Sequence, residues 1–535
     1  MVPRDAQHGR AGLMQPAPPL WRTGVLSAVA GLLLAASVAW PLPSSWFSPI
    51  AQGTSFWWLQ PLALALLCRG LQQSRSRRQA WFTGWIFAST WLAATFWWLV
   101  VAMHVYGGMN APLAVFATLL LAAALALYYA LAGLVYWRCT RRRGFAGLTG
   151  HGARWGASSL LFAALWTAAE MARGTWLTGF GWGAVGYAHV DGPLAFYAPW
   201  VGAYGLTALG AWLAAVLAQG LRLRWAAAAL LVLALPWAAA VPDWTQSTGS
   251  LRVTLLQGNI SQSNKFDAPT VEQALRWYAS QIAAAQGALV VLPETAVPLL
   301  PAQWPPGYMQ SLQDSLAAKN QSALIGAPLG DAQSGYTNAA LGLGLGVELG
   351  AEYRYDKHHL VPFGEFIPPM FHWFIDLMHI PLGDFNRGPL AAPSFVAQGQ
   401  RLGPHICYED LFGEELATRF VQPDLAPTVL VNLSNLGWFD DTVALDQHAT
   451  IARMRALEFQ RPIVRATNTG WTAIMDHRGY ILAALAPLQA GALEGLVEGR
   501  TGTTPFAWWA GRFGLWPPWI LCSLIVGAFW VRRHP

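Results

Sequence analysis

The chain has 535 residues, of which 54% are hydrophobic and only 11% are charged, against about 25% charged residues in an average soluble chain. Its net charge is +6, but the arginines cluster in short loops between apolar runs, which argues against the basic face of a nucleic-acid-binding protein. The four cysteines show no zinc-site spacing, and only Cys407 lies in the charged part of the chain, which argues against a disulfide framework.

Charged residues are rare up to about residue 241 and return to ordinary density after it. A stretch of about 20 mostly apolar residues is needed to cross a bilayer as a helix. Eight segments approach that length, so we expect an α-helical bundle of eight spans. These segments are residues 24–40, 56–68, 80–103, 111–137, 155–171, 195–218, 225–241 and 515–531.

Arginines flank these segments on one side of the expected membrane only. The loops on the other side, around residues 43–55 and 104–110, contain no Lys, Arg, Asp or Glu. The positive-inside rule then places both termini in the cytoplasm and residues 242–509 outside, which is the periplasm of a Gram-negative cell. A cleaved signal peptide is the alternative for the first segment, but it would break this alternation. The flanking arginines are Arg4, Arg10, Arg22, Arg69, Arg75, Arg77, Arg78, Arg138, Arg141, Arg142, Arg143, Arg154, Arg222, Arg224, Arg532 and Arg533.

Two charged residues stand near the end of the fifth segment. Glu170 and Arg173 are three positions apart, so one helical turn places them on the same side and lets them pair. They form either a structural ion pair or a contact to a lipid headgroup. Residues 178–182, which follow on the outer side, are expected to line a lipid entrance.

From residue 252 to about residue 498, apolar runs of strand length alternate with helical stretches, an order typical of a layered α/β domain. We therefore divide the chain into a cytoplasmic segment (1–23), seven spans (24–241), an outward α/β domain (242–509), and a last span with a short tail (510–535). The expected strands are residues 252–260, 288–293, 323–328, 336–344, 348–355, 394–407 (two strands), 428–433, 463–468 and 472–475, and the expected helices are residues 270–286, 308–319, 414–421 and 444–460.

Three side chains that follow expected strands have the chemistry of acyl transfer. Cys407 is a candidate nucleophile, Glu294 a candidate base for its proton, and Lys357 a candidate stabiliser of the thiolate and of an oxyanion. Glu365 is a candidate either to hold the lysine or to assist proton transfer, and the backbone N–H of Tyr408 is a candidate second oxyanion donor. Taken singly, each signal is weak, since most isolated buried cysteines are structural. The adjacent His358 and His359 do not indicate a metal site, because neighbours on a strand face opposite sides.

Taken together and in their order along the chain, three segments form a specific signal. Leu-Pro-Glu-Thr at 292–295, Tyr-Asp-Lys-His-His-Leu-Val-Pro-Phe-Gly-Glu at 355–365 and Ile-Cys-Tyr-Glu-Asp at 406–410 occur in the order of the Glu-Lys-Cys triad of the nitrilase superfamily. The lysine segment resembles more narrowly that of bacterial apolipoprotein N-acyltransferases, as do residues 434–439, 447–458 and 466–470. The resemblance implies a nitrilase-like αββα sandwich on a membrane bundle. Phe266 stands where that family usually has tryptophan.

The same resemblance implies the roles of individual residues. Glu294 would be the general base, Lys357 the transition-state stabiliser and Cys407 the nucleophile. Supporting residues would be Glu365, Tyr408 and Glu409, and candidate substrate contacts are Phe266, Trp438, Glu170 and Arg173.

The implied reaction transfers an acyl chain from a phospholipid, usually phosphatidylethanolamine, to a Cys407 thioester and then to the α-amine of a diacylglyceryl-cysteine apolipoprotein. We expect no metal, no cofactor and no nucleic-acid partner, and a single chain that acts alone in the inner membrane. A membrane-tethered amidase is the first alternative, but one span would suffice to anchor it. A transporter or lipid-binding scaffold is the second, but the spans lack the buried charges and paired broken helices usual in transporters.

Overall fold

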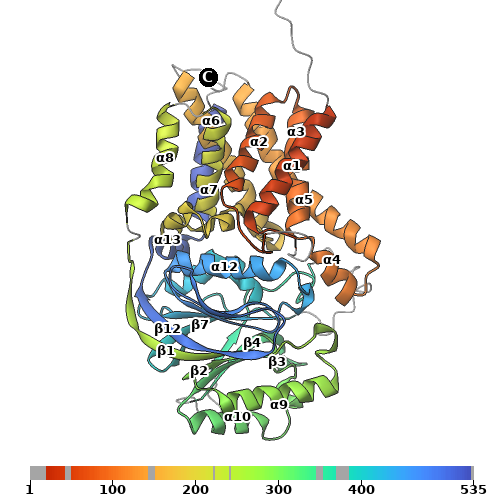
Figure 1. Cartoon of the computed structure of the whole chain (residues 1–535), viewed down its shortest axis with the longest axis vertical. Coiled ribbons are helices and arrows are strands. Elements are labelled where there is room, and N and C mark those ends of the chain that lie inside the picture. The colour runs from red at the N-terminus through yellow and green to blue at the C-terminus, as the bar shows by residue number, and fades with distance from the viewer. Residues whose placement is uncertain are drawn as a thin grey trace, which may run out of the picture.

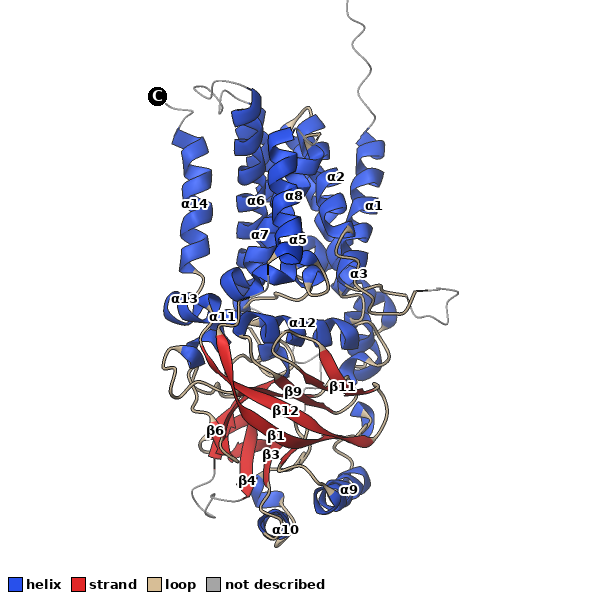
Figure 2. Cartoon of the chain, turned by 60° about the vertical axis from the view of Figure 1, so that its left-hand side comes forward, coloured by secondary structure: helices blue, strands red, loops and turns tan. Residues whose placement is uncertain are grey.

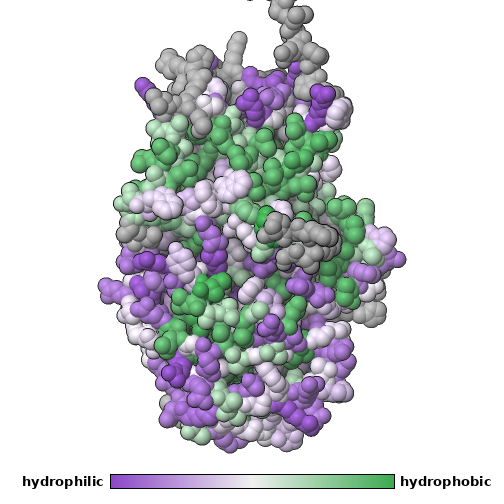
Figure 3. Space-filling model, viewed as in Figure 1, coloured by the Kyte–Doolittle hydropathy of each residue, from purple (hydrophilic) through white to green (hydrophobic). Residues whose placement is uncertain are grey.

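The computed structural model describes residues 20–42, 50–141, 151–220, 223–239, 242–344, 353–368 and 385–531. A helical bundle forms one end of the molecule, and two β-sheets with further helices form the other (Figure 1). On the face shown in Figure 3, hydrophobic residues gather over the bundle, whereas the sheet end is more polar. An N-terminal apolar part followed by an α/β domain is therefore confirmed. Of the expected cytoplasmic segment 1–23, residues 1–19 lie outside the described part.

Each of the eight apolar segments contains a helix, and these helices stand side by side (Figure 2). By length and composition, three of the described helices are able to cross a membrane, or five if each of two bent pairs is one span. By this criterion of length and composition, the described helices do not reach the expected eight membrane spans. Helices α2 and α8 have 15 and 16 residues, about 23 Å of rise against a hydrocarbon core of about 30 Å. The helices are α1 (Leu20–Val38), α2 (Leu59–Gln73), α3 (Arg77–Thr95), α5 (Ala111–Arg141), α6 (His151–Thr175), α7 (Ala198–Ala218), α8 (Leu223–Ala238) and α14 (Trp516–Val531).

The third expected span, residues 80–103, is not one continuous helix. Helix α3 ends at Thr95, and the chain bends by 62° into α4 (Leu99–Val101) and the π-helix η1 (Ala102–Tyr106). The buried Trp98 at the bend donates its Nε1–H to Gln447 of the α/β domain at 3.1 Å. The sequence prediction was wrong here because the apolar residues after Thr95 pack against the α/β domain rather than continue the span.

The α/β domain contains two six-stranded mixed sheets. The strand order of the first is β12-β1-β2-β3-β4-β5, and that of the second is β11-β10-β9-β8-β7-β6. The strands are β1 (Thr245–Gln257), β2 (Leu289–Val291), β3 (Ser322–Asp331), β4 (Gly335–Gly344), β5 (Tyr353–Asp356), β6 (Phe395–Ala397), β7 (Gln400–Ile406), β8 (Val429–Ser434), β9 (Ile463–Thr467), β10 (Thr472–Met475), β11 (Ile481–Leu485) and β12 (Gly491–Gly502).

Alternating strand residues give each sheet two apolar faces, and both are covered. The inner faces pack on each other around Val253, Leu255, Leu402 and Val431. The outer face of the first sheet packs on α9 and α10, and that of the second on α11, α12 and α13, which lie between the sheets and the bundle (Figure 2). The expected four layers of helix and sheet are present. The helices are α9 (Ala268–Ala284), α10 (Tyr308–Ala317), α11 (Gly413–Ala417), α12 (Ala444–Phe459) and α13 (Pro505–Phe513).

Three elements of the domain were not expected from the sequence, namely β11, β12 and α13. Strand β12 pairs antiparallel with β1 along nearly its whole length and alternates between exposed and part-buried residues. Its charged and glycine residues give no clear strand pattern, and its strand form follows from the long pairing with β1 and from the burial of Val497 between the sheets. The expected hairpin of residues 336–344 and 348–355 is present as the antiparallel pair β4 and β5, and residues 345–352 lie outside the described part.

The basic ends of the helices and the sheets lie at opposite ends of the bundle. Near the start of α7, the N–H of Ala203 donates to Glu458 of α12 at 2.7 Å. At the other end of α7, the Ala218 carbonyl accepts from Arg69 of α2. The arginines around the α2–α3 turn are therefore remote from the α/β domain. Of the flanking arginines, Arg4, Arg10, Arg142, Arg143, Arg222, Arg532 and Arg533 lie outside the described residues.

Candidate active site

Polar side chains gather where parallel strands of the two sheets end. Strands β1, β2 and β3 are parallel, as are β7, β8 and β9, and β5 runs in the direction of β3 because both pair antiparallel with β4. Functional groups of such sheets collect at the carboxyl ends of the strands. Glu294 follows β2, Lys357 follows β5 and Cys407 follows β7. The fold therefore brings the three predicted residues together, close enough for their charges to interact.

The carboxylate of Glu294 is buried and held from both sides. Its Oε1 accepts hydrogen bonds from Lys357 Nζ at 3.2 Å and from Asn338 Nδ2 at 2.7 Å. Its Oε2 accepts the backbone N–H of Asn435 at 2.8 Å. These donors fix the orientation of the carboxylate beside Cys407, where a base for the thiol proton has to lie.

Lys357 is fully buried and lies between two carboxylates. Its Nζ is 2.9 Å from Glu365 Oε1, which also accepts from Asn338 Nδ2 at 2.7 Å. The Asn338 amide thus joins Glu294 to Glu365. Burial alone would lower the pKa of Lys357, but the charges of Glu294, Glu365 and Cys407 raise it above its ordinary value. The ammonium is therefore a fixed positive charge at the site.

Cys407 is half-buried and begins the 3-10 turn η8 (Cys407–Leu411) with a φ of +50°. Non-glycine residues rarely adopt this left-handed region, and such strain is typical of functional turns. Burial raises the pKa of the thiol, Glu294 raises it further, and Lys357 opposes the shift without cancelling it. The raised pKa favours the protonated thiol at neutral pH, so a reaction through this sulfur requires a base that takes the proton.

Hydrogen bonds to Glu409 link the segment that carries Lys357 to the turn that begins at Cys407. Its Oε1 accepts the backbone N–H groups of His358 at 2.7 Å and His359 at 3.1 Å. Its Oε2 accepts the Tyr355 hydroxyl at 2.8 Å and the N–H of Ile406 at 2.6 Å. One carboxylate therefore sets the distance between the strand that carries Lys357 and the strand that carries Cys407.

Comparison with known proteins identifies the family. Residues 30–217 match the Apolipoprotein N-acyltransferase N-terminal domain, and residues 252–500 match the Carbon-nitrogen hydrolase family. The chain is 50% identical over 517 residues to the Apolipoprotein N-acyltransferase of Verminephrobacter eiseniae, covering 91% of this chain and 92% of that protein. It is 45% identical over 456 residues to that of Ralstonia nicotianae, covering 84% and 85%. The chain belongs to the apolipoprotein N-acyltransferase family.

Apolipoprotein N-acyltransferases carry out the N-acylation step of lipoprotein maturation, and this is the activity of the enzyme. The family resemblance of the three motifs is thereby confirmed, as is membership of the nitrilase superfamily. Among the described residues, no group of three or more His, Cys, Asp or Glu side chains is placed to hold a metal ion.

The cysteine turn of this N-acyltransferase is bonded directly to the bundle. The Tyr408 hydroxyl donates to the Gly179 carbonyl at 3.0 Å, and His359 Nε2 lies 3.2 Å from the Thr178 carbonyl. The His359 ring stacks on Phe412, with 3.4 Å between ring centroids. Residues 178–182, expected at a lipid entrance, thus lie against Tyr408, the residue that follows Cys407.

A buried polar chain supports the turn from the other side. His448 Nε2 lies 3.2 Å from the Cys407 carbonyl, and its Nδ1 is bonded to Arg465. Asp410 accepts from Arg465 at 3.0 Å and lies 2.7 Å from His405 Nε2. Burial first, and then the cation of Arg465, lowers the pKa of His448 to about 3. His448 is therefore neutral, so its Nε2–H donates to the Cys407 carbonyl and Nδ1 accepts from Arg465.

Glu170 and Arg173 do not form the expected ion pair. Glu170 accepts the N–H of Val185 at 3.1 Å and the hydroxyl of Thr207 at 2.8 Å, whereas Arg173 donates to Tyr129 at 2.8 Å and to two carbonyls of the following loop. Both side chains are buried. The prediction from spacing was wrong because each side chain turns to a different neighbouring element, and neither is presented to a lipid headgroup at the surface.

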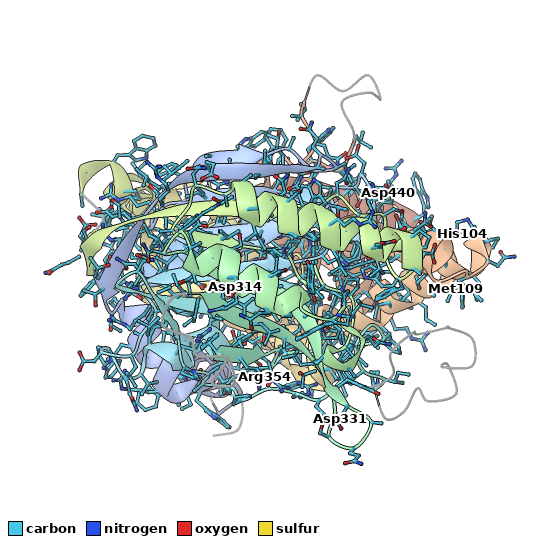
Figure 4. The ribbon with its side chains drawn as sticks, turned by 90° about the horizontal axis from the view of Figure 1, so that it is seen from below. His104, Met109, Asp314, Asp331, Arg354 and Asp440 are labelled. Carbon is cyan, nitrogen blue, oxygen red and sulfur yellow. The ribbon has the colours of Figure 1, made fainter. Side chains whose placement is uncertain are left out.

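The other two candidate substrate contacts are exposed aromatic side chains. Phe266 is 44% exposed and follows the 3-10 turn η5 (Gln262–Asn264). Trp438 is 37% exposed and lies edge-on to Tyr106 of η1, with 6.0 Å between ring centroids. Figure 4 shows the neighbouring Asp440 on the same side of the molecule as His104 and Met109, which flank the end of η1.

Sequence reasoning missed two polar residues of the site. Asn338 lies inside the largely buried strand β4, and an amide in a buried strand was a signal that could have found it. Lys265 lies in the loop after η5, with its side chain buried and its Nζ 3.4 Å from the Glu294 carbonyl. Its position beside the site depends on a contact between the loop after β1 and the residue that follows β2, which the sequence does not reveal.

Proposed function

We propose that a phospholipid, in particular phosphatidylethanolamine, acylates Cys407, and that the resulting thioester acylates the α-amine of a diacylglyceryl-cysteine apolipoprotein. The observation that carries this proposal is a thiol at the end of β7 beside a buried carboxylate that is bonded to a buried ammonium. A thioester divides one difficult acyl transfer into two easier steps.

In the first half-reaction, the Cys407 sulfur bonds to the ester carbonyl carbon while Glu294 takes the thiol proton. The carbonyl oxygen becomes an oxyanion, which Lys357 and the N–H of Tyr408 stabilise. As the second residue of a 3-10 turn, Tyr408 has an N–H without an acceptor inside that turn. The tetrahedral intermediate then breaks its carbon–oxygen bond, and the glycerol oxygen leaves with the proton from Glu294 as a lysophospholipid.

In the second half-reaction, the uncharged α-amine of the apolipoprotein attacks the thioester carbonyl. Glu294 takes the proton that the nitrogen loses, the carbon–sulfur bond breaks, and Cys407 recovers its proton. The product is an amide at the lipoprotein N-terminus. One chain supplies Glu294, Lys357 and Cys407, which supports an enzyme that acts as a monomer.

We further propose that all eight helices of the bundle are membrane spans and that the α/β domain, residues 242–509, faces the periplasm. The arginines near the α2–α3 turn support this orientation, because they lie at the end of the bundle remote from the sheets. Helices α2 and α8 cross as short spans if the bilayer thins around them, which costs little.

Replacing the nucleophile tests the proposal. We expect Cys407→Ala to reduce transfer to a diacylated lipopeptide at least about 10³-fold, because the covalent route is lost. Intact-protein mass spectrometry should find the acyl chain on Cys407 of the wild-type enzyme incubated with phosphatidylethanolamine. Cys522→Ala, which alters a buried cysteine of α14, is the matched control. Full activity of Cys407→Ala, or an adduct on another cysteine, would contradict the assignment.

A further inference from the structure

The chain contains three lysines, and two of them are buried at this site. Lys357 has two carboxylate partners. Lys265 is 3% exposed, yet its ammonium forms no ion pair with any carboxylate of the described residues. Its one hydrogen bond to them is long, 3.4 Å to the backbone carbonyl of Glu294. An ammonium donates three hydrogen bonds, and buried charges are normally paired.

The position of Lys265 is suited to binding an anion. Its charge interacts with those of Glu294 and Cys407, so it lies near the reacting thiol. The next residue, Phe266, is 44% exposed, which places Lys265 just inside the surface of the domain. Burial, partly offset by Glu294 and Cys407, lowers the pKa of Lys265 to about 8. Most of the lysine is thus still cationic at neutral pH despite the cost of burial.

The four ionisable groups Glu294, Glu365, Lys357 and Lys265 have a net charge of zero when all are ionised. Without Lys265 the cluster has a net charge of −1, which would repel an anionic substrate. The acyl donor of the proposed function carries such an anion, because a phosphodiester is joined to the same glycerol as the reacting ester. The phosphate lies only several bonds from the ester carbonyl, so both enter the site together.

We propose that Lys265 is a donor-binding residue whose ammonium binds the phosphodiester of the phospholipid while the ester carbonyl lies at Cys407. This inference rests on the proposed function, since it assumes a phospholipid acyl donor. Lys265 would then favour phospholipids over uncharged esters in the first half-reaction. It would contribute little to the second, because the acceptor reacts through an uncharged amine.

The test compares two donors with the same acyl chain, phosphatidylethanolamine and an uncharged p-nitrophenyl ester. The acylation rate of Cys407 in the full-length enzyme is followed by intact mass. We expect Lys265→Gln to slow acylation by the phospholipid about tenfold or more, and acylation by the uncharged ester less than about twofold. Lys319→Gln, the same change at an exposed lysine whose Nζ bonds carbonyls at the end of α9, should match the wild type with both donors.

Equal slowing with both donors would overturn the inference, because Lys265 would then act only by positioning Glu294 through its carbonyl. Unchanged rates with both donors would overturn it as well. If Lys265→Gln does not fold, Lys265→Met keeps the length of the buried chain and tests the same charge. Inorganic phosphate added to the uncharged-ester reaction should have no effect; a change confined to the wild type would reassign the site to free phosphate. If the wild type forms no thioester from phospholipid, the proposed function itself fails, which is a separate result.

Discussion

Lys357 and Lys265 differ in the groups that neutralise them, and this difference has a consequence for pH. The two carboxylates beside Lys357 raise its pKa above the ordinary value of a lysine, so it remains charged at neutral and mildly alkaline pH. Lys265 has no such partners, and burial lowers its pKa to about 8. As the pH rises, Lys265 therefore loses its charge while Lys357 keeps its own.

The rate of Cys407 acylation by a phospholipid should fall as the pH rises through about 8. Lys265 is cationic below its pKa and neutral above it, so the anion-binding form disappears at high pH. The Cys407 thiol, whose charge interacts with that of Lys265, does not reverse this sign, because its own pKa is raised. We expect a loss of about tenfold between pH 7 and 9.5, measured as the second-order rate with excess enzyme.

The uncharged p-nitrophenyl ester provides the control for this profile, because it has no phosphate for Lys265 to bind. Its acylation rate should not fall over the same interval. A rate that falls equally with both donors would place the titration on another group, and a rate that rises with the phospholipid would contradict the assignment to Lys265.

The sequence was informative for residues whose position is set by a single strand. Glu294 and Cys407 each follow an apolar run, and the end of such a run in a parallel sheet is where chemistry collects. Lys265 reaches the same site through a contact between its loop and the residue after β2, which leaves no local pattern, whereas Asn338 is marked only by its polarity within a buried strand. The spacing of Glu170 and Arg173 led to a wrong prediction of an ion pair. A helical turn places two side chains on the same side, but it does not decide which neighbouring groups they bond.

At the scale of elements, α12 is the main link between the sheets and the bundle. Its residue Gln447 accepts the Nε1–H groups of Trp98 at 3.1 Å and Trp182 at 2.7 Å, and donates to the Thr95 carbonyl at 2.9 Å. The partners come from the bend after α3 and from the loop after α6. A single buried amide thus holds two separate bundle segments against one helix, close to the cysteine turn that His448 supports.

Replacing Gln447 by leucine should loosen this junction. Leucine leaves two buried indole N–H groups and one carbonyl without partners, which we expect to lower the free energy of unfolding by about 3 kcal/mol. Thermal unfolding of the detergent-solubilised enzyme measures the effect. Gln273→Leu, on the exposed side of α9, should change stability by less than about 0.5 kcal/mol. Equal stability of the two variants would show that Gln447 does not carry the junction.

The elements that sequence patterns did not predict depend on partners elsewhere. Strand β12 contains glycines and two glutamates, and its strand form follows from its long antiparallel pairing with β1. The break after Thr95 likewise reflects packing against the α/β domain rather than a helix-breaking residue. By contrast, α9 and α10 have their own amphipathic patterns and were expected where they occur.

At the scale of the whole molecule, the polarity of the bundle gives a prediction about membrane orientation. Asp314 is exposed on α10 and is visible in the view from below the sheets (Figure 4). Arg75 is exposed at the α2–α3 turn, at the other end. In intact cells, a membrane-impermeant maleimide that passes the outer membrane should label Asp314→Cys at least about tenfold more than Arg75→Cys.

After the inner membrane is opened, both introduced cysteines should react to a similar extent, which controls for their exposure. The native Cys68, Cys139 and Cys522 are buried and contribute little background. Labelling of Arg75→Cys but not of Asp314→Cys in intact cells would invert the proposed topology and place the α/β domain in the cytoplasm.

The bond from the Tyr408 hydroxyl to the Gly179 carbonyl, next to Cys407, limits how this architecture can be recombined. The two halves of the chain match separate families, which suggests interchangeable modules. Because the turn that begins at Cys407 takes part of its support from a bundle loop, a chimera has to inherit both sides of that contact from one parent. Protein engineers who wish to retarget the enzyme should therefore exchange loops at the remote, arginine-bearing end of the bundle and leave the junction intact.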